Sequence, residues 1–169
     1  MSANCYVQHN ADLTGMMKER LEDYYQRQIP PALPQHILFY RDGVSESQYG
    51  EFRVKELPQI GKACQELAAR YSQTVPSLTF VIVAKRHHGR FFASPSSKYN
   101  LLSGALIDEE IVAPKQFNFY LQAHDSPIAT ALNAHYVVLE NQCGYSADEL
   151  QKLVSFSNYP HGCEVVNAN

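Results

Sequence analysis

The chain has 169 residues, of which 45% are hydrophobic and 18% are charged, and its formal net charge is -3. This length fits a single globular domain. A weakly acidic chain has no overall positive field to attract a polyanion, so any nucleic-acid site must be local. The apolar stretches, such as 80–84, are far shorter than the roughly 20 residues that span a bilayer. We therefore expect no membrane contact.

The four cysteines have no paired C-x-x-C spacing, and the first residues show no basic region followed by an apolar run. This pattern predicts a reduced, intracellular protein. We expect it in the cytoplasm, with the nucleus as the alternative.

The first half of the chain alternates between helical and strand patterns. Apolar residues at three- and four-residue spacing predict a helix from 11 to about 26. A short buried strand is predicted over 36–40, with the turn-forming pair Asp42-Gly43 at its carboxyl end. Pro58 is predicted to begin a new helix with Ile60, Cys64, Leu67, Ala68 and Tyr71 on its apolar face.

The continuous β-branched run at 78–84 predicts a strand covered on both faces, which a strand-helix-strand order makes parallel to the first. Further strands are predicted at 91–92, 106–107, 117–123 and 135–140, with a loop over 94–103. Ser146 and Glu149 form a capping box that opens a last helix. The predicted architecture is mixed α/β, a sheet flanked by helices.

Asp42 is the first candidate for chemistry, because a carboxylate at the end of a strand is a common metal or substrate ligand. An ordinary turn-forming Asp-Gly pair is the alternative. The run from Lys85 to Arg90, K-R-H-H-G-R, follows the second strand and brings three cations and two imidazoles to one end of the sheet. Such a cluster can bind phosphates, although basic residues at a solvated strand end are also common.

Other kinds of site have little support in the sequence. His124 and His135 lie too far apart for a tight zinc motif, and isolated histidines usually make ordinary hydrogen bonds. The chain has no G-x-S-x-G elbow and no phosphate-binding glycine loop.

The segment I-L-F-Y-R-D-G-V-S-E-S-Q-Y at 37–49 resembles the PIWI domain of eukaryotic Argonautes, most closely the fungal ones. Four further segments follow in the order of that family. They are E-L-P-Q-I-x-x-A-C, T-F-V-I-V-A-K-R-H-H-G-R-F-F, F-N-F-Y-L-Q-A-H, and A-H-Y-V-V-L-E-N with S-A-D-E-L-Q-K-L. The similarity covers about 11–153, followed by a divergent tail at 154–169, and we interpret 1–169 as a partial PIWI domain.

The resemblance implies an RNase H-like fold that holds a guide RNA paired with a target RNA in RNA-mediated gene silencing. In slicing members, a tetrad of three acidic residues and an Asp or His binds two divalent ions, which implies Mg²⁺ as the cofactor. Asp42 matches one tetrad aspartate. Lys85 and Arg90 match contacts to the guide backbone, as does His124, and Arg86 belongs to the same basic motif.

Several departures from the family pattern accompany these matches. The segments that would carry the first tetrad aspartate, the glutamate and the fourth ligand have no counterpart, and Leu132 stands where the family has an arginine. Without the early strands and the C-terminal end of the RNase H-like sheet, we expect marginal stability or dependence on a partner, such as another protein of the Argonaute pathway.

Three functions follow as hypotheses. The first is a PIWI domain fragment that binds RNA backbone and does not slice by itself, because one carboxylate cannot hold two cations against their hydration. The second is a Mg²⁺-dependent RNA endonuclease whose tetrad is completed by a partner. The third is a truncated gene product without function.

Overall fold

The computed structural model describes residues 12–85, 87, 89–92, 101–109, 116–122 and 133–156. In chain order the elements are α1 (Leu13–Arg27), β1 (His36–Asp42), the 3-10 helix η1 (Glu46–Gln48), α2 (Tyr49–Tyr71), β2 (Ser77–Ala84), β3 (Leu106–Ile107), β4 (Asn118–Leu121), β5 (Ala134–Asn141) and α3 (Ala147–Phe156). The strands form one sheet in the order β1-β2-β5-β4-β3. β1 and β2 are parallel and the other neighbours are antiparallel, so the predicted mixed sheet and its parallel pair are confirmed.

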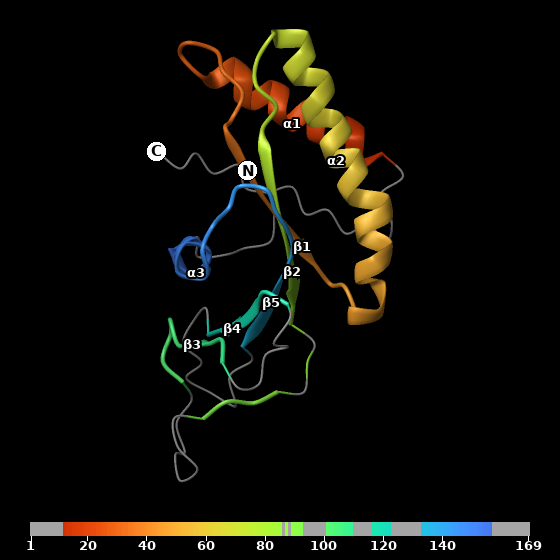
Figure 1. The fold of residues 1–169 in the computed structure, drawn as a ribbon. Helices are drawn as coiled ribbons and strands as arrows, with labels where there is room; N and C mark the ends of the chain where they lie inside the picture. Colours follow the sequence, from red (N-terminus) through yellow and green to blue (C-terminus); the bar gives the residue numbers. More distant parts are fainter. Residues whose placement is uncertain are drawn as a thin grey trace.

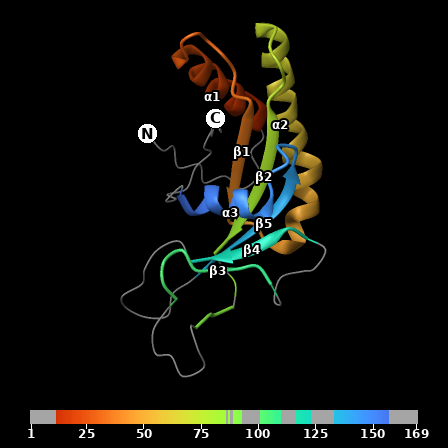
Figure 2. The ribbon, with the colours of Figure 1, turned by 60° about the vertical axis from the view of Figure 1, so that its left-hand side comes forward.

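Helices cover both faces of this sheet (Figure 1). α1 and α2 pack on one face and α3 packs on the other, which is clearest when the molecule is turned (Figure 2). β1 shows how the sequence produces two cores. Ile37 and Phe39 belong to the cluster with α1 and α2, whereas Leu38 and Tyr40 belong to the cluster with α3. Alternate side chains of a strand point to opposite faces, so an unbroken apolar run fits a strand buried on both sides.

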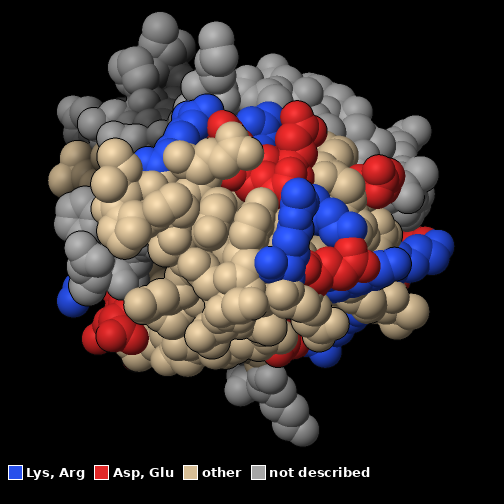
Figure 3. Space-filling model, turned by 90° about the horizontal axis from the view of Figure 1, so that it is seen from above, with Lys and Arg blue, Asp and Glu red and all other residues tan. Residues whose placement is uncertain are grey.

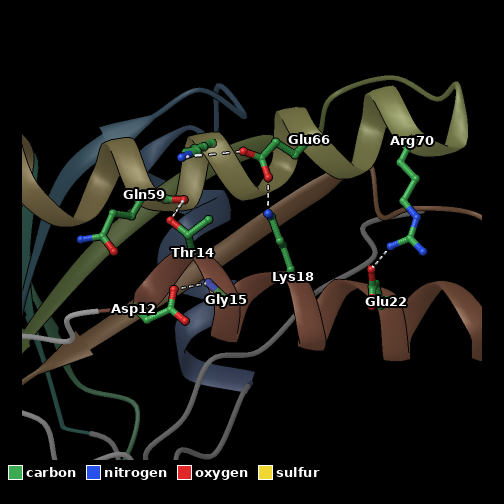
Figure 4. A network of polar contacts seen from close by, with 9 residues as sticks. Asp12, Thr14, Gly15, Lys18, Glu22, Gln59, Glu66 and Arg70 are labelled. Carbon is green, nitrogen blue, oxygen red and sulfur yellow. Dashed lines mark hydrogen bonds and ion pairs between the residues drawn. The ribbon is translucent and has the colours of Figure 1, made fainter.

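Polar contacts join α1 to α2 outside the apolar core (Figure 4). Asp12 caps α1 by accepting a hydrogen bond from the Gly15 amide at 2.8 Å. Lys18 forms an ion pair with Glu66 of α2, and the pKa of that glutamate is lowered mainly by its hydrogen bond with Lys18. The same two helices therefore have a buried apolar contact and a solvated, charged one.

The prediction that Pro58 begins a helix is wrong, because α2 runs through it without a break. Pro58 cannot donate a hydrogen bond to the Val54 carbonyl, a defect that costs about 3 kcal/mol inside a helix. Buried side chains lie on both sides of the proline, among them Phe52 before it and Ile60 and Leu67 after it. Each such side chain contributes roughly 1.5–3 kcal/mol, so the continuous apolar face outweighs the defect.

The smaller predicted elements had mixed outcomes. The strands at 106–107, 117–123 and 135–140 are confirmed as β3, β4 and β5. At 91–92 there is no strand, and Phe92 forms a single isolated bridge. The capping box is confirmed, since the Glu149 carboxylate accepts from both the amide and the hydroxyl of Ser146 at 2.8 Å. Most of the predicted loop at 94–103 lies outside the described residues.

The described surface carries charges of both signs side by side. Viewed from the end where α1 and the last turns of α2 lie, Lys and Arg side chains alternate with Asp and Glu (Figure 3). Arg70 and Glu22, for example, form an ion pair between the two helices. In the part of the chain that the structure describes, no helix is long and apolar enough to cross a membrane.

Candidate nucleic-acid interface

The carboxyl ends of β1 and β2 bring Asp42 and Lys85 together. The two strands are parallel neighbours, and Asp42 pairs in register with Val83, two residues before Lys85. The Lys85 Nζ lies 3.1 Å from the Asp42 Oδ2, and the two side chains are 45% and 39% exposed. Gly43, the next residue after the end of β1, has a φ of +80°, a conformation that favours glycine. The strand-end carboxylate predicted from sequence is therefore paired with the first residue of the predicted basic run.

Arg41, the residue before Asp42, is held by a buried ion pair. Its Nε lies 3.2 Å from the Glu56 Oε2, and its guanidinium carbon lies 5.2 Å from the centre of the Phe52 ring. Glu56 is 5% exposed. Removing either partner of a buried pair leaves an uncompensated charge, so this contact fixes the end of β1 against α2. Arg41 therefore has a structural role beside the candidate site.

Arg90 is exposed, and its guanidinium is bound by the backbone of its own segment. Its Nη1 donates to the carbonyl oxygens of His87 at 3.2 Å and Gly89 at 2.8 Å. The other two predicted RNA-binding residues, Arg86 and His124, lie outside the described residues.

Negative charge also lies at this end of the sheet. Burial and then the charge of Asp42 raise the pKa of Tyr136 to about 12. Burial and then the charge of Glu46 raise the pKa of Tyr120. The cations Lys85 and Arg90 thus share this end of the sheet with the carboxylates of Asp42 and Glu46. Any attraction for phosphate is therefore local and depends on the direction of the cationic groups.

The described residues do not by themselves form a site for a pair of divalent cations. Among them, no three His, Cys, Asp or Glu side chains come close enough to hold a metal ion. One carboxylate oxygen of Asp42, the Oδ2, accepts a hydrogen bond from the ammonium group of Lys85. A hard cation takes several oxygen ligands, so one carboxylate that already pairs with lysine is a poor match.

A set of rings beside the basic segment was not predicted as part of any site. His87 packs edge-on against Tyr120, with ring centres 5.1 Å apart. His135 stacks on Tyr120 at 4.2 Å, and its Nε2 lies 3.0 Å from the Asn118 Oδ1. The expectation that isolated histidines make ordinary hydrogen bonds is confirmed for His135. The sequence shows that these segments contain aromatic and imidazole side chains, but it does not show which of the rings contact each other.

The arrangement of this sheet and its helices is that of Argonaute-type proteins. The C-terminal lobe of a budding yeast Argonaute has a TM-score of 0.79 at 23% identity, over 87% of this chain and 32% of that one. Kluyveromyces polysporus Argonaute has a TM-score of 0.80 at 22% identity, over 90% and 20%. Drosophila Piwi has a TM-score of 0.75 at 27% identity, over 92% and 21%. At the level of the fold, the RNase H-like architecture expected from the resemblance is confirmed.

The profile of the Piwi domain matches residues 3–162, and the chain belongs to this family. Argonaute 4 of Arabidopsis thaliana is 42% identical over 145 residues, which are 86% of this chain and 15% of that protein. Argonaute 1B of rice is 40% identical over 155 residues, 87% of this chain and 13% of that protein. The chain thus spans about one seventh of these plant relatives. The expected closeness to fungal Argonautes stays a prediction.

Proposed function

We propose that this PIWI chain binds the backbone of guide and target RNA in RNA-guided gene silencing, without cleaving RNA by itself. The observation that carries the proposal is the position of Lys85 and Arg90, two exposed cations on the short segment that follows the carboxyl end of β2. Family membership supports RNA as the polyanion, and one related structure is of Kluyveromyces polysporus Argonaute with a guide RNA. Arg86 and His124 are proposed to contribute to the same surface.

Binding of this kind depends on charge and not on base identity. Phosphate contacts by lysine and arginine release counterions, so affinity falls as salt rises, and the slope reports the number of contacts. Hydrogen bonds to phosphate carry no sequence information. We therefore expect salt-dependent binding with little preference between RNA sequences.

Fluorescence anisotropy with a short labelled RNA, single-stranded and annealed to its complement, tests the proposal. The Lys85→Ala/Arg90→Ala variant should bind more weakly, and the slope of log affinity against log salt should fall by about 0.7 per lost contact to a single strand. Unchanged binding by this variant would overturn the proposal.

A matched control removes the same charge elsewhere. Arg27 and Lys62 are exposed cations of α1 and α2 that form helical ion pairs with Asp23 and Glu66. The Arg27→Ala/Lys62→Ala variant should bind RNA almost as the unmodified chain does. An equal loss in both double variants would show that net charge, and not the end of the sheet, determines binding.

A further inference from the structure

The basic segment after β2 docks on β4 through two aromatic contacts. The His87 ring meets the Tyr120 ring edge-on at 5.1 Å and 73°. Phe91 meets the same tyrosine at 5.0 Å and 62°. Edge-to-face ring pairs stabilise a contact beyond the burial of their apolar area. The segment that carries Lys85 and Arg90 is thus attached on both sides of Gly89.

A hydrogen bond from the His87 side chain also holds this segment. The His87 Nε2 lies 2.5 Å from the backbone carbonyl oxygen of Asn133, the residue that precedes β5. A carbonyl oxygen only accepts, so the Nε2 carries the proton and donates. The bond links residues that are 46 positions apart. It therefore ties the segment 85–90 to the residue that precedes β5, the strand next to β2.

The other nitrogen of His87 does not face solvent. Its Nδ1 is buried and has no hydrogen-bond partner within the described part of the chain. A Cβ at Gly89 would lie 3.2 Å from this nitrogen, so the backbone of Gly89 covers it closely. With one nitrogen bonded and the other covered, the ring is placed for packing and not for contact with an external phosphate.

Tyr120, on which His87 packs, is itself fixed from the other side. The His135 ring stacks on it at 4.2 Å and 9°. The Asn118 amide donates to the Gln116 carbonyl at 2.8 Å, so its oxygen is left to accept from the His135 Nε2 at 3.0 Å. His87 thus packs against a ring whose own neighbour is oriented by hydrogen bonds.

From these contacts we infer that His87 is a positioning residue for RNA binding, which holds the basic segment so that Arg90 and Lys85 meet the phosphates. The backbone carbonyls of His87 and Gly89 accept from the Arg90 guanidinium, so a shift of His87 shifts that guanidinium directly. The inference rests on the proposed function. It assigns His87 a role different from that of the cations beside it.

A double-mutant cycle on RNA affinity separates the two roles. His87→Ala should weaken binding by about three- to tenfold, because the cations must then be ordered on binding. In the Lys85→Ala/Arg90→Ala background, the same change should have no further effect. A full, additive loss in that background would show that His87 contacts RNA itself and would overturn the inference.

Two further variants keep the test independent of folding. His87→Gln retains a donor at the position of the Nε2 and should recover most of the affinity. Tyr120→Phe keeps the ring and should bind as the unmodified chain does, whereas Tyr120→Leu should weaken binding less than His87→Ala, because it removes the ring contact and leaves the hydrogen bond to Asn133. Thermal unfolding of each variant identifies any that fail to fold. A folded His87→Gln chain that does not recover RNA affinity would contradict the inference. Unchanged RNA affinity of a folded His87→Ala chain would contradict it as well.

Failure of the inference differs from failure of the proposed function. If the Lys85→Ala/Arg90→Ala variant binds RNA normally, the proposed function is wrong whatever His87 does. If that variant loses affinity and His87→Ala alone does not, only the positioning role is wrong.

Discussion

Replacing Asp42 with asparagine should increase the affinity of the chain for RNA in the absence of divalent metal. In the structure the Lys85 ammonium is paired with the Asp42 carboxylate at 3.1 Å, so this carboxylate competes with a phosphate for the lysine. Asparagine keeps the size of the side chain and removes the charge that holds the lysine. The same change also removes a negative charge that repels the RNA backbone.

The size of the effect follows from the exposure of the pair. At 3.1 Å two unit charges in water attract by about 1.3 kcal/mol. The two side chains are 45% and 39% exposed, and exposed pairs contribute about 0.2–1 kcal/mol. Releasing Lys85 should therefore raise RNA affinity by about 1.5- to fivefold, with the larger value at low salt.

Anisotropy titrations in EDTA at two salt concentrations would measure this gain. Asp23→Asn is a suitable control, because Asp23, like Asp42, pairs with a cationic side chain, here Arg27, and is 46% exposed. In a Lys85→Ala background, most of the gain from Asp42→Asn should disappear. An unchanged or lower affinity for Asp42→Asn in EDTA would refute the idea that the two partners compete for Lys85.

Three further predictions concern stability and reactivity. Pro58→Ala restores a hydrogen-bond donor to the Val54 carbonyl inside α2 and should raise the free energy of unfolding, measured in urea, by about 1–3 kcal/mol. A free energy of unfolding below that of the unmodified chain would show that the helix depends on the proline. Burial raises the pKa of the Cys64 thiol to about 11, so iodoacetamide at pH 8 should label Cys64 at least about tenfold more slowly than Cys143. Peptide mass spectrometry would measure the two labelling rates, and equal rates would contradict the buried position of Cys64. Burial and then the charge of His87 lower the pKa of His135 from 6.5 to about 4. As the pH falls, the unfolded chain therefore takes up a proton before the folded chain does, and the free energy of unfolding should decrease between pH 6.5 and 4. The decrease should be roughly 1–3 kcal/mol, because the ring is only partly buried. Urea titrations of the His135→Phe variant should show a flatter pH dependence, and an identical slope would exclude this histidine as the cause.

Local signals in the sequence were sufficient where a single element decided the outcome. The run at 78–84 predicted a doubly covered strand, and the Ser146–Glu149 box predicted the start of α3. The prediction for Pro58 is wrong because buried side chains on either side of it outweigh its intrinsic helix penalty, and only the packed structure shows that they are buried.

The candidate site was predictable in part. That Asp42 and Lys85 share one end of the sheet followed from two parallel buried strands. That they contact each other did not, because they are 43 residues apart and their contact depends on strand register. The contacts of His87 could not be predicted for a similar reason, since its partners are Tyr120 on β4 and Asn133, the residue before β5. In sequence it was one of two imidazoles in a basic run.

The parallel pairing of β1 and β2 also determines which changes of chain length this site tolerates. Asp42 and Lys85 are placed by interstrand hydrogen bonds and not by the connection between the strands. Extra residues in the turn after α2 would lengthen the chain between them and leave their separation unchanged. A slip of β2 by one residue would instead move Lys85 by about 3.3 Å and turn the side chains of β2 to the opposite faces. In this part of the fold, an insertion in the turn after α2 should leave the pair in place, whereas an insertion within a strand would disrupt it.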